Sequence, residues 1–136
     1  MIRPGEARDL AEIRAIQAAS LESACWDPAS YLNFDLLVAT EGARVAGFLV
    51  GRTLTAREHE LLDLAVAPDF RRKGIGSALV IAWLERAQGE VFLEVRPSNH
   101  AARQFYKFLA FEEVSSRPDY YHNPPEPAIV LKFHSC

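Results

Sequence analysis

The segment from Leu61 to Glu85 constrains the fold of this 136-residue chain more than any other part. It begins with the run LLDLAVA, which is short and β-branched at Val66, so a strand is favoured over a helix. The chain then breaks at Pro68 and turns at Gly74 and Gly76. Apolar residues follow at four-residue spacing, the pattern of an amphipathic helix: Ile75, Leu79 and Trp83. The segment therefore predicts a strand, a glycine turn and a helix start.

Three cations stand immediately before this predicted helix: Arg71, Arg72 and Lys73. A helix N-terminus carries roughly half a positive charge and unpaired N–H groups, so cations beside it are repelled unless an anion is bound. Gly74 and Gly76 lack Cβ atoms and would let a ligand approach the main chain closely. Two interpretations follow, a phosphate or pyrophosphate cradle and a solvated basic turn.

The glycine spacing separates this turn from two common phosphate loops. The chain has no GxxxxGK[ST] motif, and Leu79 stands where the third glycine of GxGxxG would be. The stretch from Arg71 to Gly76, RRKGIG, resembles instead the R/Q-x-x-G-x-G/A acetyl-CoA loop of the GNAT (Gcn5-related N-acetyltransferase) family. The preceding LAVAPDFR is also similar to that family.

Composition predicts a single domain over residues 1–136. The chain is 49% apolar, which suits one compact core, and no apolar run approaches the roughly 20 residues of a membrane span. The N-terminus lacks the apolar core of a signal peptide, so we expect a cytoplasmic protein with no membrane partner. The net charge of −3 argues against direct nucleic-acid binding. The two cysteines and four histidines are scattered, so neither a metal site nor a disulfide is expected.

The pattern of elements predicts the fold class. Strands are expected at residues 2–3, 35–40, 45–53, 59–67, 91–95, 111–116 and 128–133. Helices are expected at about 6–20, 75–88 and from a cap at Ser98 or Asn99 to about Leu109. Residues 21–34 are expected to be irregular or partly helical, and the proline-rich residues 117–127 are expected to form a loop. This order predicts an α/β (α+β) domain, with a mixed, mostly antiparallel sheet and helices on both faces.

Glu94 is a candidate general base. It is the single charge in VFLEV, a strand that the pattern predicts to be buried on both faces. Alternation puts Glu94 and Arg96 on the same side, so a structural ion pair between them is the alternative. An amine must lose a proton before it attacks a thioester, and a strand carboxylate could accept that proton.

Tyr106 is a candidate general acid. It follows Phe105 in QFYKFLAF, at the edge of the predicted apolar side of the helix. The ordinary interpretation is a half-buried tyrosine with one hydrogen bond. The functional interpretation is a phenol that protonates a leaving thiolate.

The segment LEVRPSNHAARQFYKFLAF resembles LEVRxSNxxAxxxYxxLGF of RimI-type N-terminal acetyltransferases, within the GNAT family. The resemblance implies that Glu94 is the base, that Tyr106 is the acid and that Asn99 contacts acetyl-CoA. It implies further cofactor contacts at Leu64, Ala65, Val66, Arg71, Arg72, Lys73, Gly74, Ile75, Gly76 and Ser77. The segments YLNF and RPDYYHNP are also similar to RimI, and Tyr120 and Tyr121 are expected to line the acceptor site.

Two departures from the RimI pattern bear on the acceptor. Only DPAS separates Trp26 from Tyr31, where RimI proteins have a longer, helix-bearing insert that helps to hold the peptide. Ala110 replaces the glycine of LGF. Left-handed backbone angles cost alanine about 1 kcal/mol more than glycine.

Together these features predict an acetyl-CoA-dependent N-acetyltransferase that needs no metal. The expected acceptor is a protein N-terminal α-amine, on a ribosomal or other protein. A small-molecule amine is the alternative acceptor, and a non-catalytic acyl-CoA-binding module is the rival of another class. The joint presence of Glu94 and Tyr106 argues against that rival.

Overall fold

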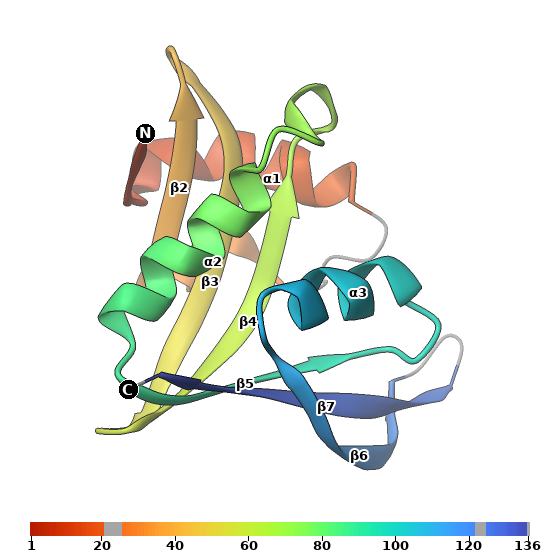
Figure 1. Ribbon diagram of the computed structural model, residues 1–136. Helices are drawn as coiled ribbons and strands as arrows, with labels where there is room; N and C mark the ends of the chain where they lie inside the picture. The colour runs from red at the N-terminus through yellow and green to blue at the C-terminus, as the bar shows by residue number, and fades with distance from the viewer. Residues whose placement is uncertain (21–25, 122–124, 136) are drawn as a thin grey trace.

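A computed structural model of the chain describes residues 1–20, 26–121 and 125–135. Within these residues one seven-stranded sheet has the order β1-β2-β3-β4-β5-β7-β6 (Figure 1). The strands are β1 (Ile2–Pro4), β2 (Asp35–Glu41), β3 (Arg44–Thr55), β4 (Glu58–Val66), β5 (Gly89–Val95), β6 (Glu112–Tyr121) and β7 (Glu126–Ser135). β4 and β5 pair in parallel and the other neighbours are antiparallel, so the predicted mixed sheet is confirmed.

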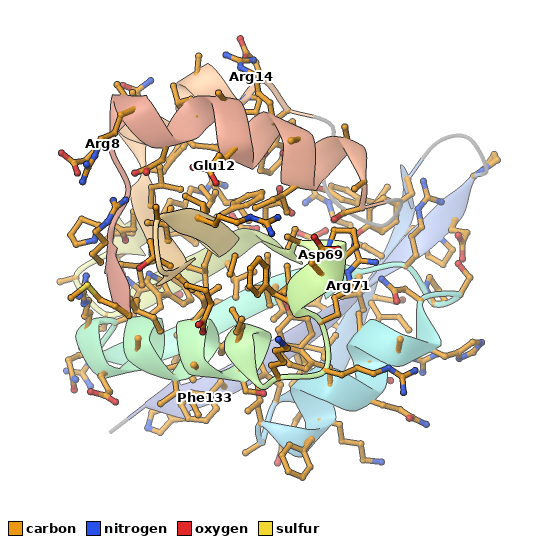
Figure 2. The ribbon with its side chains drawn as sticks, turned by 90° about the horizontal axis from the view of Figure 1, so that it is seen from above. Arg8, Glu12, Arg14, Asp69, Arg71 and Phe133 are labelled. Carbon is orange, nitrogen blue, oxygen red and sulfur yellow. The ribbon has the colours of Figure 1, made fainter. Side chains whose placement is uncertain are left out.

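Helices cover both faces of the sheet, as predicted. They are α1 (Leu10–Ala18), α2 (Ile75–Arg86) and α3 (His100–Phe108), with 3₁₀ turns η1 (Ala7–Asp9), η2 (Pro28–Asn33) and η3 (Pro68–Phe70). α1 lies on one face, and α2 and α3 lie on the other (Figure 1 and Figure 2). The first helix is shorter than the predicted 6–20, because its first turn is the 3₁₀ turn η1.

Each face has its own apolar core. On the α1 face, Ile13 and Tyr31 pack with Phe48 of β3, and all three are fully buried. On the other face, Leu79 and Trp83 of α2 pack with residues of β5 and α3. Burial of these apolar surfaces is what holds the helices against the sheet.

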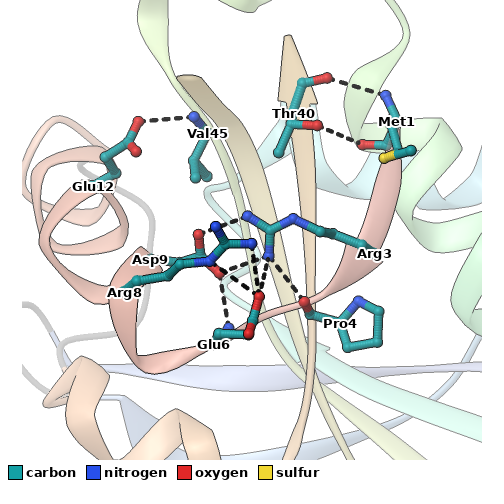
Figure 3. Close-up of polar contacts among 9 residues, drawn as sticks. All are labelled: Met1, Arg3, Pro4, Glu6, Arg8, Asp9, Glu12, Thr40 and Val45. Atoms are coloured by element: carbon teal, nitrogen blue, oxygen red, sulfur yellow. Dashed lines mark hydrogen bonds and ion pairs between the residues drawn. The ribbon is translucent and has the colours of Figure 1, made fainter. Parts of the chain in front are cut away.

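A partly buried ion pair joins the start of the chain to η1 (Figure 3). Arg3 donates from Nη1 to Oδ2 of Asp9 and from Nη2 to Oδ1, both at 2.8 Å. The main-chain N–H of Glu6 also donates to Asp9 Oδ2, at 2.8 Å. Asp9 is only 3% exposed, so its carboxylate depends on these donors.

The C-terminal half differs from the sequence prediction in two respects. β6 and β7 extend through most of residues 117–127, which were predicted to be a loop. Pro118 is tolerated because β6 lies at the sheet edge, where proline need not remove a ladder hydrogen bond. β7 also lies between β5 and β6, so the predicted β-α-β-α-β run makes only one parallel neighbour pair.

Ala110 has a φ of 74°, the left-handed geometry expected where RimI proteins have glycine.

Candidate active site

The strands β4 and β5 begin as neighbours and then diverge (Figure 1). Their parallel register covers only Glu58–Glu90, His59–Val91 and Glu60–Phe92. β4 has an irregularity at this point, because Val50 of β3 pairs with Asp63 while Gly51 pairs with Leu61. The extra residue, Leu62, is a bulge, which bends a strand and increases its twist. The second half of β4 therefore presents an edge that β5 does not cover.

The main-chain groups on this open edge belong to Leu64 and Val66. The Ala67 N–H donates to the Ala46 carbonyl on the β3 side, at 2.7 Å. Successive residues of a strand turn their polar groups to opposite edges, so those of Ala65 also face β3. Of the three predicted cofactor-contacting strand residues, only Leu64 and Val66 offer main-chain groups to the gap.

The predicted glycine loop leads into α2 as expected. Gly74 is the N-cap, with a φ of 77°, and no side chain caps the first turn. Arg72 and Lys73 are exposed beside it, and Arg72 also has a positive φ, of 64°. A helix start without a capping side chain, flanked by cations, is suited to bind an anion such as a phosphate.

Arg71 is held differently from its two cationic neighbours. Its Nε donates to the Val66 carbonyl at 3.0 Å, which covers one outward group of β4. Its Nη2 reaches the Ala19 carbonyl at 3.4 Å and Ser20 Oγ at 3.3 Å, next to the end of α1 (Figure 2). Arg71 therefore ties the loop to the α1 side as well as adding positive charge.

The start of α2 meets the end of β4 and the middle of α3. A Cβ added at Gly76 would lie 3.5 Å from the Phe105 ring and 3.7 Å from Val66. Asn99 caps α3 through its side-chain oxygen, which accepts the Ala102 N–H at 3.1 Å. The glycine loop, the end of β4 and α3 therefore meet at Gly76.

Glu94 lies on the sheet face opposite α2 and α3. Its neighbours Leu93 and Val95 are buried in the α2 core, so alternation puts Glu94 on the other face. That face is only partly covered, which corrects the prediction that this strand is buried on both faces. The side chain is 15% exposed, and its Oε2 is buried with no hydrogen-bond partner among the described residues.

The partner of Glu94 is Arg117, not the Arg96 of the alternative interpretation. Arg117 Nη1 donates to Glu94 Oε1 at 3.1 Å, and Arg96 Nη1 donates to Glu126 Oε2 at 3.0 Å. The interpretation of Glu94 and Arg96 as a structural pair is therefore wrong. Two-residue spacing put both on one face, but β6 and β7 supply a separate partner for each.

Tyr120 and Tyr121 stand over these ion pairs. The Arg117 guanidinium lies 4.4 Å from the Tyr120 ring centroid, and the Arg96 guanidinium lies 4.6 Å from that of Tyr121. Burial, with smaller contributions from Tyr120 and from the charge of Glu94, raises the pKa of Tyr121 to about 12. The predicted acceptor-site tyrosines are thus beside Glu94 and remain neutral near pH 7.

Tyr106 belongs to the α2 side of the sheet and is 6% exposed. Its ring packs edge-on against Phe105 and Phe111, at 4.9 and 5.4 Å between centroids. Burial raises its pKa above the ordinary value, and the nearby Asp63 adds to this. The phenol therefore keeps its proton, as a general acid must. Glu94 and Tyr106 lie on opposite faces of the sheet and can serve one substrate only through the gap between β4 and β5.

Sequence reasoning missed Asp63, which is 5% exposed on β4. Its Oδ2 lies 3.0 Å from the Tyr31 hydroxyl, and its Oδ1 accepts the Leu64 N–H at 2.9 Å. A signal was available, because Asp63 is the only charge in the run LLDLAVA. Arg117 was missed as well, and no local pattern marks its long-range pairing with Glu94.

In the described parts of the chain, no cluster of three or more His, Cys, Asp or Glu side chains could hold a metal ion. Among the same residues, no helix has the length and apolar character needed to cross a membrane.

Comparison with known proteins agrees with this geometry. Residues 7–111 match the model of the acetyltransferase (GNAT) family. The [ribosomal protein bS18]-alanine N-acetyltransferase of Escherichia coli K12 is 40% identical over 107 residues, which are 74% of this chain and 70% of that protein. The N-alpha-acetyltransferase RimI of Mycobacterium tuberculosis is 36% identical over 107 residues, covering 71% and 67%.

A solved structure is similar over the whole chain. The crystal structure of Ard1 from Thermoplasma volcanium has a TM-score of 0.90 and 31% identity, and the match covers 100% of this chain and 97% of that one. The family match spans well over half of the chain, and both relatives exceed 30% identity. The chain therefore belongs to the acetyltransferase (GNAT) family, which uses acetyl-CoA, and is an N-acetyltransferase.

Proposed function

We propose that this enzyme transfers the acetyl group of acetyl-CoA directly to the N-terminal α-amine of a protein. The observation that carries the proposal is the placement of Glu94 and Tyr106 on opposite faces of the sheet at the β4–β5 gap. A base on one side and an acid on the other suit a reaction in which the amine and the thioester approach from opposite directions.

The residues around Gly76 fit a CoA thioester. Its diphosphate would bind the N–H groups from Lys73 to Ser77, with charge from Arg72 and Lys73, since the α2 start has no side-chain cap. Its extended arm would follow the open edge of β4 at Leu64 and Val66, a form of strand addition. Ala65, Ile75 and Asn99 complete the proposed cofactor site. When bound, the thioester supplies an activated acyl carbon.

Glu94 would act on the acceptor. Its Oε2 has no hydrogen-bond partner among the described residues and would take the amine proton, directly or through water, while Arg117 holds Oε1. An α-amine has a reference pKa of about 8, against about 10.4 for lysine, so a larger neutral fraction is available to a carboxylate base. Tyr120 and Tyr121 would line the acceptor side.

Tyr106 would act on the leaving group. Its protonated phenol would donate to the CoA sulfur as the carbon–sulfur bond breaks and the amide bond forms. The acetyl group then resides on the acceptor nitrogen. The amine nitrogen loses one proton to Glu94 and the CoA sulfur gains one from Tyr106. Proton exchange with water then returns both residues to their starting forms, so the reaction needs no further reactant.

The names of the relatives support a protein as the acceptor. The Escherichia coli relative is named for the alanine of ribosomal protein bS18, so a ribosomal protein N-terminus is the finer proposal. A small-molecule amine is the second candidate, because only η2 and a few residues separate Trp26 from β2. That short connection supplies less surface for holding a peptide.

A thiol-release assay tests both candidates. The panel would contain peptides with a free N-terminus, the same peptides with a blocked N-terminus and an internal lysine, and small diamines. Turnover of the free-N-terminus peptides alone is expected, and it should fall at least about 100-fold in Glu94→Gln. Turnover of diamines alone would favour the small-molecule acceptor, and CoA binding without any turnover would favour the non-catalytic module.

A further inference from the structure

The open edge of β4 is already occupied at the position where the proposed cofactor arm would pair. The Ala67 N–H faces β3, where it donates to the Ala46 carbonyl, and polar groups alternate between the two edges of a strand. Leu64 is three residues earlier, so its N–H faces away from β3. It donates to Oδ1 of the preceding residue, Asp63, at 2.9 Å. A strand N–H without a strand partner is thus satisfied by a side chain rather than left unpaired.

The other oxygen of Asp63 has its own anchor. Oδ2 lies 3.0 Å from the Tyr31 hydroxyl, whose single proton is shared between this oxygen and Gln17 Oε1, at 2.6 Å. The orientation of the Gln17 amide is set in turn by its donation from Nε2 to the Trp26 carbonyl, at 2.7 Å. Asp63 can therefore keep its contact with Tyr31 while Oδ1 exchanges its partner.

We propose that Asp63 is a positioning residue that holds the Leu64 N–H in the ligand-free protein and yields it to the carbonyl oxygen of a bound thioester. The proposal rests on the proposed function, since it needs the thioester to lie along β4. One N–H serves one acceptor well, so the two oxygens compete for it.

The exchange has a consequence for the two forms of the cofactor. Acetyl-CoA carries a carbonyl oxygen that can take the N–H, whereas CoA has no such oxygen. With CoA bound, the Leu64 N–H donates to Asp63 again. This N–H therefore has an acceptor with either form of the cofactor, and neither form is retained because of it. A carboxylate is a stronger acceptor than a neutral carbonyl, so the acetyl group adds little to the affinity of the wild-type protein.

The test compares the dissociation constants of CoA and of an unreactive acetyl-CoA analogue, in which a ketone replaces the thioester. In the wild type the ratio of the two constants should be near one. In Asp63→Ala the N–H is available, so the ratio should rise about fivefold to tenfold in favour of the analogue, the worth of about one hydrogen bond. Asp63→Asn, which keeps a neutral acceptor, should lie between them.

Tyr31→Phe is the matched control, because it removes the anchor of Oδ2 and leaves the bond from Leu64 to Oδ1. Its ratio should stay near that of the wild type. An unchanged ratio in both Asp63 variants would overturn the proposal, as would an equal rise in Tyr31→Phe. Each ratio compares two ligands on one protein, so partial loss of folded protein does not alter it.

Hydrogen exchange of the Leu64 amide separates this proposal from the proposed function. In the ligand-free full chain, that amide should exchange at least about fivefold faster in Asp63→Ala than in the wild type. Equal exchange overturns the role of Asp63 whatever binds. If the wild type binds neither CoA nor the analogue, the proposed function fails, while slow exchange at Leu64 would still support its retention by Asp63.

Discussion

The Arg117 guanidinium lies 3.1 Å from Glu94 Oε1, although the two residues are 23 positions apart in the chain. Arg117 comes from the edge strand β6, where the register with β7 is irregular between Arg117 and Tyr121. The contact engages one oxygen of the carboxylate and leaves Oε2 buried and without a hydrogen-bond partner among the described residues. An ion pair from the sheet edge thus distinguishes the two oxygens of the proposed base.

Removing this ion pair should affect catalysis more than folding. We expect Arg117→Met to lower kcat/KM for the acceptor about tenfold, because Glu94 loses the donor that orients it. Stability should change by less than about 1 kcal/mol, since Arg117 is 59% exposed and exposed ion pairs contribute little. Steady-state kinetics and urea denaturation measure the two effects.

Arg103→Met is the control for Arg117→Met. It breaks an ion pair of similar length, 2.9 Å from Arg103 to Glu113, on the α3 side of the sheet. Its kcat/KM should stay within about twofold of the wild type, and its stability should also change by less than about 1 kcal/mol. Equal losses of activity in both variants would contradict a specific role for Arg117.

Much of the fold could be predicted because its determinants are local. The spacing of Leu79 and Trp83 follows the helix period, and both are buried on α2 as expected. Asn99, one of two predicted caps, accepts the Ala102 N–H. The extent of β6 could not be predicted, because Pro118 is typical of loops and the strand depends on pairing with β7.

Some residues of the candidate site could likewise be predicted from the sequence, and others could not. Glu94, Tyr106 and the glycine loop stand in contiguous segments that resemble a family, so the sequence could single them out. Arg117 and Asp63 contact residues distant in sequence, Glu94 and Tyr31, and no spacing rule connects them. The sheet faces on which Glu94 and Tyr106 lie could not be predicted without the strand order and the point where β4 and β5 diverge.

Tyr106→Phe should separate proton donation from binding. The substitution keeps the ring that packs between Phe105 and Phe111 and removes only the hydroxyl. We expect kcat to fall about 100-fold, while the dissociation constant of CoA changes less than about threefold. Because burial raises the pKa of Tyr106, the wild type should show no loss of activity from its ionisation below about pH 10. Full activity of the variant would remove Tyr106 as the acid.

Gly76→Ala should weaken cofactor binding without weakening the fold. The added Cβ would make ordinary contacts, 3.5 Å from Phe105 and 3.7 Å from Val66, and alanine is a better helix former than glycine. The same methyl group would occupy the proposed path of the CoA arm. We expect the dissociation constant of CoA, measured by calorimetry, to rise about tenfold or more, equivalent to about 1.4 kcal/mol.

Gly42→Ala should show the opposite behaviour and serves as the control for Gly76→Ala. Gly42 lies in the β2–β3 turn with a φ of 60°, and a Cβ there would meet nothing within 4 Å. Alanine should therefore lower stability by about 1 kcal/mol through backbone strain and leave CoA affinity unchanged. Normal CoA binding by Gly76→Ala would contradict the proposed path of the arm.

Arg3→Met should destabilise the fold strongly, by about 3 kcal/mol at pH 7, because it leaves the buried Asp9 carboxylate without its bidentate partner (Figure 3). Arg8→Met is the matched control, since Arg8 pairs with Glu6 at the same 2.8 Å but the two side chains are 70% and 56% exposed. Its loss should stay below about 1 kcal/mol. Urea denaturation of both variants measures these losses.

The pH dependence of the Arg3→Met effect tests its ionic origin. The hydrogen bond from Arg3, more than that from the Glu6 N–H, lowers the pKa of Asp9 below its ordinary value of 3.8. A lowered pKa in the folded protein means that the stabilisation is fully present above the unfolded value and is lost as the pH falls through the folded one. The difference between wild type and Arg3→Met should therefore shrink as the pH is lowered below about 4. A difference that persists undiminished after Asp9 is protonated would show that packing of the Arg3 stem, and not its charge, stabilises the start of the chain.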